Sequence, residues 1–323
     1  MMQQQRLRTI EWDGRPISKP GMYGKLSLAR YHLPGVCIGP SVSSGGLRMV
    51  ASRSPAHFFD TWPENPQRKE RKDTAALILG RATHHLLLGE LFFSKLFAVQ
   101  PVEYVSDKGE VKPWHNGANA CKDWQADRKR EGRAVLTVED AENIRGMAYS
   151  LSLHPMVIGT GRRDGILNGL IERSLVWQDK ATGLWCKARP DAIPTDSGDF
   201  VDLKTTRSVL WMDLQRSIFD YGYYAQAAFI RMGAREVLGL DRITFTLVFV
   251  ENESPYCTEI VSLKDNDLDL GEREIRRALD TVARCLKSGH WPGPGGEHSD
   301  ARPIEISEQA RQRAEDRLKY ADT

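Results

Sequence analysis

The sequence predicts a mixed α/β fold in which a central mixed sheet is flanked by helices. Residues 170–205 and 243–263 alternate apolar and polar side chains with the two-residue period of strands. Residues 73–93, 211–232 and 266–288 instead show the spacing of helices. Helices that precede, separate and follow the strands are able to cover both faces of one sheet.

The helices have recognisable start signals. The segment from Asp73 begins with a residue that caps helices and continues without proline, as expected of a buried helix. Residues 118–131 and 137–153 predict two further helices, and Thr137 with the acidic Glu139 and Asp140 marks the start of the second.

The strands follow in a compact order. Residues 170–178 and 184–193 flank the turn-rich DKATG segment and predict a hairpin. Residues 199–205 come after a second turn, so three consecutive antiparallel strands are expected. Strands at 243–253 and 256–263 complete the predicted sheet.

Composition divides the chain into three parts. Residues 1–53 are rich in Gly, Pro and Ser without a sustained period, and predict an irregular N-terminal arm. Residues 54–295 carry the periodic elements and form the predicted main domain. Residues 296–323 are polar and are expected to be a C-terminal tail.

Charge and cysteine usage exclude several classes of protein. The 45 Lys and Arg nearly balance the 43 Asp and Glu, so any nucleic-acid surface must be locally basic. Five cysteines without a C-x-x-C pair argue against a zinc site, an iron–sulfur cluster or a disulfide framework, and favour a reducing compartment. No apolar run approaches the about 20 residues of a membrane span, and the start lacks the apolar region of a signal peptide. We expect a cytoplasmic protein that does not contact a membrane.

Three charged residues stand in segments that otherwise read as buried strands. Asp202 and Lys204 lie two residues apart, so both point to the same side of their strand. Asp191 follows Pro190, which suits a strand edge or bend. Carboxylates from adjoining strands then converge and repel each other, and Lys204 supplies only one positive charge. A divalent metal would supply the remainder, although a structural salt bridge at a strand end also explains the triplet.

Oxygen ligands select hard cations such as Mg²⁺ or Mn²⁺, and such a site indicates metal-assisted hydrolysis of a phosphodiester. The metal polarises the scissile phosphate and lowers the pKa of a bound water, which Lys204 orients or deprotonates. Glu172, on the first hairpin strand, either completes the site or faces solvent. His84 and His85 are about 100° apart around their helix, so only one faces the site, and a lone histidine on an apolar helix is more often a core residue.

The chain resembles a known family of nucleases in five segments taken in order. These are GRATHHLLLGE (80–90), IERSLVWQDKATGLWCKARPDAI (171–193), DFVDLKTT (199–206), FDYGYYAQAAF (219–229) and HWP (290–292). Together they resemble the nuclease domain of exonuclease VIII, the RecE-type phage recombination exonucleases, in the RecB-like branch of the PD-(D/E)xK superfamily. The resemblance implies a restriction-endonuclease-like core and a Mg²⁺-dependent exodeoxyribonuclease in which Mn²⁺ substitutes.

The resemblance also implies a role for each matching residue. The implied catalytic residues are Lys204, Asp202, Asp191 and Glu172. The implied metal ligands are His84, Asp191, Asp202, Glu172 and the main-chain carbonyl of Leu203. The implied DNA contacts are Gln226, Tyr223, Tyr224, Ser43, Ser44 and Arg48, the last three as candidates for capture of a 5′-phosphate.

One position departs from the family pattern. Gln226 matches the glutamine of a Gln-x-x-x-Tyr helix motif, but Ile230 stands where that motif carries tyrosine. The contact of that tyrosine is therefore either lost or supplied by Tyr223 or Tyr224.

Members of the family digest linear double-stranded DNA processively from 5′ to 3′, as closed rings, and leave 3′ single strands for a RecT-like annealing protein. The resemblance therefore implies DNA ends as substrate, a homo-oligomeric ring and a RecT-like partner. Two alternatives stay open: a structure-specific or nicking endonuclease of the same superfamily, and a non-catalytic module that binds DNA ends.

Overall fold

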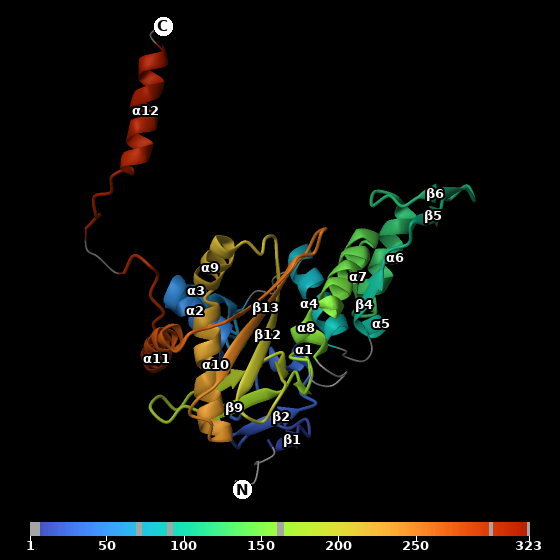
Figure 1. The fold of residues 1–323 in the computed structure, drawn as a ribbon. Helices are drawn as coiled ribbons and strands as arrows, with labels where there is room; N and C mark the ends of the chain where they lie inside the picture. The colour runs from blue at the N-terminus through green and yellow to red at the C-terminus, as the bar shows by residue number, and fades with distance from the viewer. Residues whose placement is uncertain (1–6, 69–72, 89–92, 160–164, 297–299, 322–323) are drawn as a thin grey trace.

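The computed structural model of the chain describes residues 7–68, 73–88, 93–159, 165–296 and 300–321. Strands occupy the centre of the molecule with helices on both sides, and a smaller lobe extends from one side (Figure 1). The last helix stands away from the body on the other side (Figure 1).

Two five-stranded sheets form the centre of the described chain. The first has the order β1 (Thr9–Glu11), β2 (Gly21–Gly24), β9 (Ser174–Gln178), β10 (Trp185–Ala188) and β3 (Ser41–Ser43). The second has the order β14 (Thr258–Ser262), β13 (Thr244–Glu251), β12 (Asp199–Thr206), β11 (Ala192–Ile193) and β8 (Leu170–Ile171). In the second sheet β12 pairs parallel with β13, whereas the other pairs are antiparallel, so this central sheet is mixed.

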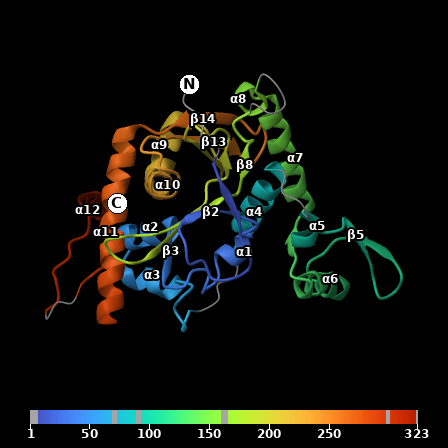
Figure 2. The ribbon, with the colours of Figure 1, turned by 90° about the horizontal axis from the view of Figure 1, so that it is seen from below.

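Helices cover both faces of the mixed sheet. Their bounds are α1 (Leu28–Tyr31), α2 (Ser44–Ser52), α3 (Pro55–Thr61), α4 (Ala75–Leu87), α5 (Phe93–Leu96), α6 (Asn119–Arg130), α7 (Val138–Leu153), α8 (Pro155–Ile158), α9 (Trp211–Asp220), α10 (Tyr223–Leu238), α11 (Asp265–Ser288) and α12 (Glu308–Ala321). Figure 2 shows α10 and α11 side by side on one flank, and α4 and α7 on the opposite flank. The smaller lobe contains α5, α6 and two pairs of strands. In the first pair β4 (Phe97–Val99) lies beside β7 (Ala134–Leu136), and in the second β5 (Glu103–Val105) lies beside β6 (Val111–Pro113).

The alternation of side chains along β12 connects two hydrophobic cores. Phe200 packs into the larger core with Phe229 of α10, whereas Val201 and Leu203 pack into a second core with Met147 of α7. All five side chains are almost completely buried. Asp202 and Lys204 therefore face the same side as Phe200, toward α10.

The fold class predicted from the sequence is confirmed: the chain is mixed α/β, with a mixed sheet between helices. The predicted helices at 118–131 and 137–153 are α6 and α7. The start signal of α7 is also confirmed, because Thr137 and Asp140 form a reciprocal capping box.

The prediction of long continuous strands at 170–178 and 184–193 was wrong. The first divides into β8 and β9, and the second into β10 and β11, so each passes from one sheet to the other. Glu172, at the first break, has a φ of +53° in the left-handed region, and Pro190, at the second, donates no ladder hydrogen bond. The chain thus bends sharply at two neighbouring points.

The expectation that residues 1–53 are irregular was also wrong. This segment supplies β1, β2 and β3, three of the five strands of the first described sheet, together with α1 and α2. Two of its pairings, β1 with β2 and β3 with β10, are parallel, and the second joins distant parts of the chain. The boundaries proposed at 53 and 295 stay predictions.

The predicted helix at 211–232 is two helices. Gly222, with a φ of +63°, separates α9 from α10, which runs on to Leu238. A left-handed residue ends one helix and re-aims the next, and glycine adopts it without a Cβ penalty. In the part of the chain that the structure describes, no helix is both long enough and apolar enough to cross a membrane.

Candidate active site

The charged residues singled out in the sequence meet where the two sheets separate. Glu172 lies between β8 and β9, and Asp191 lies between β10 and β11. The amide of Glu172 donates to the carbonyl of Asp191 at 2.9 Å, so the two bends are joined directly. Asp202 and Lys204 lie on the adjoining strand β12, and His84 lies on α4.

Three of these residues form a compact group of metal-ligand atoms. One ligand atom each from His84, Glu172 and Asp191 lies within 4.8 Å of the other two. His84 Nδ1 is 3.3 Å from Asp191 Oδ2, which also accepts a hydrogen bond from the amide of Leu203 at 2.6 Å. The sheet bends therefore hold two carboxylates and one imidazole around a common point.

The pKa values in this group reflect the neighbouring charges. Burial alone would lower the pKa of His84, but the Asp191 carboxylate raises it above its ordinary value. Burial alone would raise the pKa of Asp191, but His84, Lys204 and the Leu203 amide hold it below its ordinary value. Asp191 is therefore an ionised carboxylate.

Asp202 has different partners from Asp191. Its Oδ1 accepts a hydrogen bond from Gln226 Nε2 of α10 at 2.9 Å, and its Oδ2 forms an ion pair with Lys204. The side chain is 2% exposed. Burial and the nearby Asp191 carboxylate raise the pKa of Asp202, and Lys204 only partly opposes this. Two close carboxylates thus differ in their affinity for a proton.

Lys204 is a buried ammonium. Burial would lower its pKa, but the Asp202 and Asp191 carboxylates raise it above its ordinary value. Its Nζ lies 4.9 Å from the ring centroid of Tyr223, at the start of α10. This environment favours the charged ammonium, and the expectation that Lys204 orients or deprotonates a water stays a prediction.

The donor set fits a hard divalent cation. Carboxylate oxygens with one imidazole suit Mg²⁺ or Mn²⁺, and the ionised Asp191 supplies negative charge. His84, Glu172 and Asp191 would hold the ion. Asp202 is engaged by Lys204 and Gln226, so its role as a ligand, like that of the Leu203 carbonyl, stays a prediction.

Arg189 is a site residue that the sequence reasoning missed. Its Nε lies 2.5 Å from Glu172 Oε2, and both side chains are nearly buried. Its guanidinium carbon also lies 5.6 Å from the ring centroid of Tyr31. Arg189 directly precedes Pro190 and Asp191 in the sequence. A charged residue beside a predicted strand bend is the pattern from which its role in the site could have been predicted.

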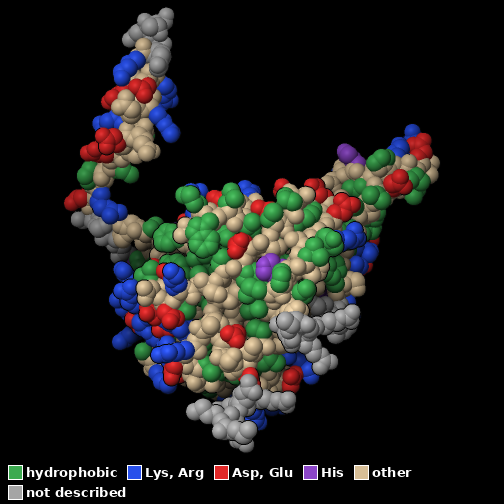
Figure 3. Space-filling model, in the orientation of Figure 1, with side chains coloured by type: hydrophobic (Ala, Val, Ile, Leu, Met, Phe, Trp, Pro, Cys, Tyr) green, Lys and Arg blue, Asp and Glu red, His purple; other side chains and the backbone are tan. Residues whose placement is uncertain are grey.

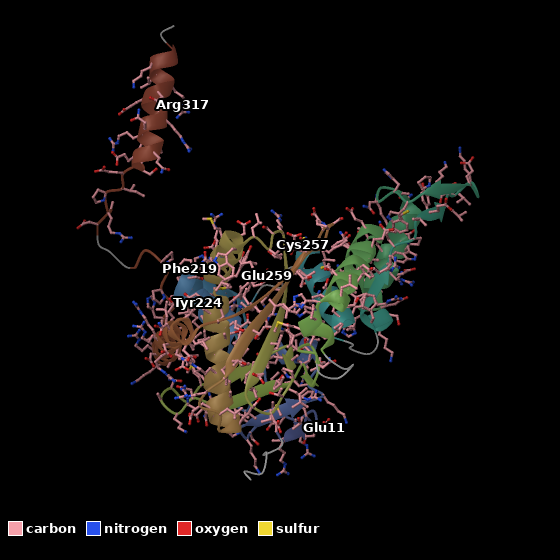
Figure 4. The ribbon with its side chains drawn as sticks, viewed as in Figure 1. Glu11, Phe219, Tyr224, Cys257, Glu259 and Arg317 are labelled. Atoms are coloured by element: carbon pink, nitrogen blue, oxygen red, sulfur yellow. The ribbon has the colours of Figure 1, made fainter. Side chains whose placement is uncertain are left out.

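The predicted DNA-contact residues fall into separate places. Gln226 and Tyr223 face Asp202 and Lys204. Tyr224 points away from them, because its hydroxyl donates to Glu274 of α11 at 2.7 Å. Figure 4 labels Tyr224 at the junction of α9 and α10. Arg48 of α2 donates from Nη1 to the carbonyl of Tyr221.

Ile230 is a core residue, so a tyrosine at this position would place its hydroxyl among apolar side chains. Ile230 is 1% exposed and lies in the larger core with Phe229. Of the two tyrosines considered as substitutes, Tyr223 lies against Lys204 and Tyr224 does not.

Ser43 lines a cavity of about 190 Å³ beside the site. The cavity also contains the first turn of α2, including Gly45 and Gly46, together with His32 and Lys187. Lys187 is 3% exposed, and its Nζ donates to the Tyr31 carbonyl at 2.9 Å. Among the described residues no carboxylate forms an ion pair with it. Burial lowers the pKa of Lys187, and nearby Cys37 and Glu64 only partly oppose this, so an anion bound in the cavity would favour the charged form of the lysine.

The pKa of His32 responds to the positive charges around the same cavity. Burial and then the nearby cations, of which Lys187 and Arg189 act most strongly, lower this pKa to about 4. His32 is therefore neutral at physiological pH, and the cavity is cationic without it. Ser44 and Arg48 do not line this cavity, and the capture of a 5′-phosphate by Ser43, Ser44 and Arg48 stays a prediction.

The sheet with Asp-x-Lys on its central strand, and a second aspartate at the end of the neighbouring strand, defines a restriction-endonuclease-like fold. The chain belongs to the family described as PDDEXK-like domain of unknown function (DUF3799), which matches residues 43–302.

The fold is shared with solved structures. One of them is a protein from Eubacterium rectale described as a "Putative exonuclease", with a TM-score of 0.52 and 12% sequence identity. The match covers 84% of this chain and 92% of that one. At this identity the similarity supports the fold alone. No curated protein matches the chain.

Proposed function

We propose that the protein is a Mg²⁺-dependent exodeoxyribonuclease that degrades linear double-stranded DNA. The observation that carries this proposal is the convergence of His84, Glu172 and Asp191 beside the Asp202–Lys204 pair. A structural salt bridge does not require a third acidic group and an imidazole within 4.8 Å. Membership of the PDDEXK-like family supports the same chemistry.

The residues divide the work by charge. A bound Mg²⁺ would polarise the scissile phosphate and activate a water. Lys204, kept positive by Asp202, neutralises charge that develops on the phosphate. Gln226 holds the Asp202 carboxylate in place, and Arg189 does the same for Glu172.

We further propose RecE-like action from the 5′ end. The cationic cavity beside the site supports this, because an open helix N-terminus and a buried lysine suit a terminal phosphate. Of the three residues that the resemblance implies for capture of a 5′-phosphate, Ser43 lines this cavity, and Lys187 lines it as well. Processive digestion by a homo-oligomeric ring, with 3′ single strands passed to a RecT-like annealing protein, completes the proposal.

The test uses linear duplex DNA labelled separately at each 5′ and 3′ terminus, beside a closed circle of the same sequence. With Mg²⁺ we expect early release of 5′-terminal nucleotides and an intact circle, and with EDTA no release. Cutting of the circle would favour the endonuclease alternative. Absence of hydrolysis with either Mg²⁺ or Mn²⁺, with retained binding to DNA ends, would favour the non-catalytic module.

End recognition is tested with matched 5′-phosphate and 5′-hydroxyl duplexes. We expect the wild type to prefer the phosphorylated end, and Lys187→Met to lose that preference. Arg48→Ala serves as the comparison, because Arg48 lies outside the cavity. A Lys187→Met protein that unfolds at the wild-type temperature and keeps the preference would exclude the cavity as the phosphate site.

A further inference from the structure

Helix α9 and the residues around it leave large apolar side chains in solvent. Phe219 is 69% exposed and Tyr221 is 63% exposed, whereas Leu214 is the one buried residue of this fully described helix. Figure 3 shows hydrophobic side chains gathered over this part of the surface. The exposed set consists of Leu210, Trp211, Met212, Phe219 and Tyr221. A cluster of large apolar side chains exposed to solvent commonly marks a binding site.

The aromatic end of this surface adjoins the proposed active site. The ring of Tyr221 stacks on that of Tyr223 with 5.6 Å between centroids and 30° between planes. The Tyr223 ring lies 4.9 Å from Lys204 Nζ. Two contacts thus lead from a solvent-exposed ring to the lysine that would face the scissile phosphate.

The exposed rings are held in position from below. Phe219 stacks on Tyr224 with 6.3 Å between centroids and 4° between planes, and Tyr224 is fixed by its hydrogen bond to Glu274. Figure 4 shows Phe219 and Tyr224 together at the junction of α9 and α10. The Tyr221 backbone is fixed by the Arg48 guanidinium. The rings therefore present flat faces without large loss of side-chain freedom.

Cations alternate with these rings. Arg48 lies at Tyr221, and Lys204 lies at Tyr223. A nucleotide combines an anionic phosphate with a flat base, so exposed rings beside the half-buried Arg48 and the buried Lys204 match a DNA strand better than they match an apolar protein surface.

We propose that Tyr221 and Phe219 form a stacking platform for unpaired bases of the DNA strand whose phosphate enters the site. The platform rests on the proposed nuclease function, and it specifies the substrate: a strand end separated from its complement. Bases stack on aromatic rings without sequence preference, because every base has a flat face. Tyr221 and Phe219 are positioning residues, since they lie outside the group that would touch the reacting atoms.

The test compares two short single-stranded oligonucleotides of equal length, one normal and one abasic, with Ca²⁺ in place of Mg²⁺. Both carry the same phosphates, so a difference in Kd reports contacts with bases. We expect the wild type to bind the normal strand at least about fivefold more tightly. The double variant Tyr221→Ala with Phe219→Ala should lose this difference, whereas Tyr221→Phe should retain it.

Tyr149→Ala is the matched control, because Tyr149 is 68% exposed on the distant helix α7. It should keep the base preference. Equal binding of both strands by the wild type, or a preference that survives in the double variant, would overturn the proposal. A double variant that keeps the preference but forms smaller oligomers would identify the surface as a contact between copies of the chain.

Hydrolysis of labelled duplex with Mg²⁺ separates this proposal from the proposed function. Cleavage by a wild type that shows no base preference would overturn the platform and leave the nuclease function standing. A base preference without any hydrolysis would leave the platform and remove the nuclease.

Discussion

Asp202 combines burial, a raised pKa and a neighbouring carboxylate in one side chain. The folded state binds a proton at Asp202 more tightly than the unfolded state does, so the ionised form costs stability. The loss of stability is absent at pH values below the pKa of Asp202 in the unfolded state, and it is complete at pH values above the pKa of Asp202 in the folded state. In the proposed nuclease, this position would serve chemistry at the expense of stability.

We predict that Asp202→Asn abolishes cleavage and stabilises the metal-free protein. Activity should fall at least about 100-fold. At neutral pH the free energy of unfolding and the Tm should both rise, because the ionised carboxylate of the wild type costs stability. Thermal unfolding with EDTA across the carboxylate pH range measures this, and the gain should disappear in acid. Normal Mg²⁺-dependent activity would mean that the site lies elsewhere.

A substitution of Gln226 would test whether its hydrogen bond to Asp202 matters for activity. Gln226 Nε2 donates to Asp202 Oδ1, so Gln226→Ala should lower activity by about 10- to 100-fold. Excess Mg²⁺ should recover part of the loss, which a defect in folding would not allow. Gln312→Ala, on the exposed helix α12, is the control and should leave the rate unchanged.

At the scale of elements, the turn between β9 and β10 is bonded to helix α11 through the side chain of Asp179. Asp179 Oδ2 accepts from the Thr182 amide and hydroxyl at 3.0 and 2.6 Å, and Oδ1 accepts from Arg276 of α11 at 2.7 Å. Burial would raise the pKa of Asp179, but Thr182 and Arg276 lower it below its ordinary value. The turn thus contains a stabilising carboxylate.

We predict that Asp179→Asn destabilises the protein by about 1–2 kcal/mol at pH 7. A lowered folded pKa contributes stability above the unfolded pKa, and that contribution is lost as pH falls through the folded pKa. The difference from wild type should therefore shrink in acid. Urea unfolding at several pH values measures it, with Asp241→Asn as a control because Asp241 is 86% exposed. A difference independent of pH would mean that the carboxylate charge is not the cause.

At the scale of the whole molecule, the N-terminal segment and the C-terminal helix differ in how they are integrated. Residues 9–43 provide three strands of one sheet, and Met22, Val42 and Leu47 contribute to the larger core. In contrast, the described side chains of α12 are almost all exposed. One end of the chain is part of the fold and the other is an appendage.

We predict that deletion of residues 1–53 abolishes cooperative unfolding, because β9 and β10 lose their partners and the core loses buried side chains. Deletion of residues 301–323 should change Tm by less than about 1 °C. Circular dichroism during heating compares the two. A cooperative transition in the first deletion would contradict the role of the N-terminal strands.

Local patterns were sufficient for much of the fold. Periodicity located α6, α7, α11, β13 and β14, because each buries one face along a continuous segment. The Asp-x-Lys spacing on β12 predicted that both side chains share a face, and the structure confirms this through their ion pair.

What the sequence determined by itself is therefore the α/β class, most helices and the identity of Asp191, Asp202 and Lys204 as neighbours in one site. Only the tertiary structure decided which strands exchange sheets, that residues 9–43 complete one of them, that Arg189 pairs with Glu172 in the site and that Lys187 lines the neighbouring cavity. The reason is physical: periodicity reports which face of an element is buried, whereas strand partners and charge pairs depend on segments far apart in the chain.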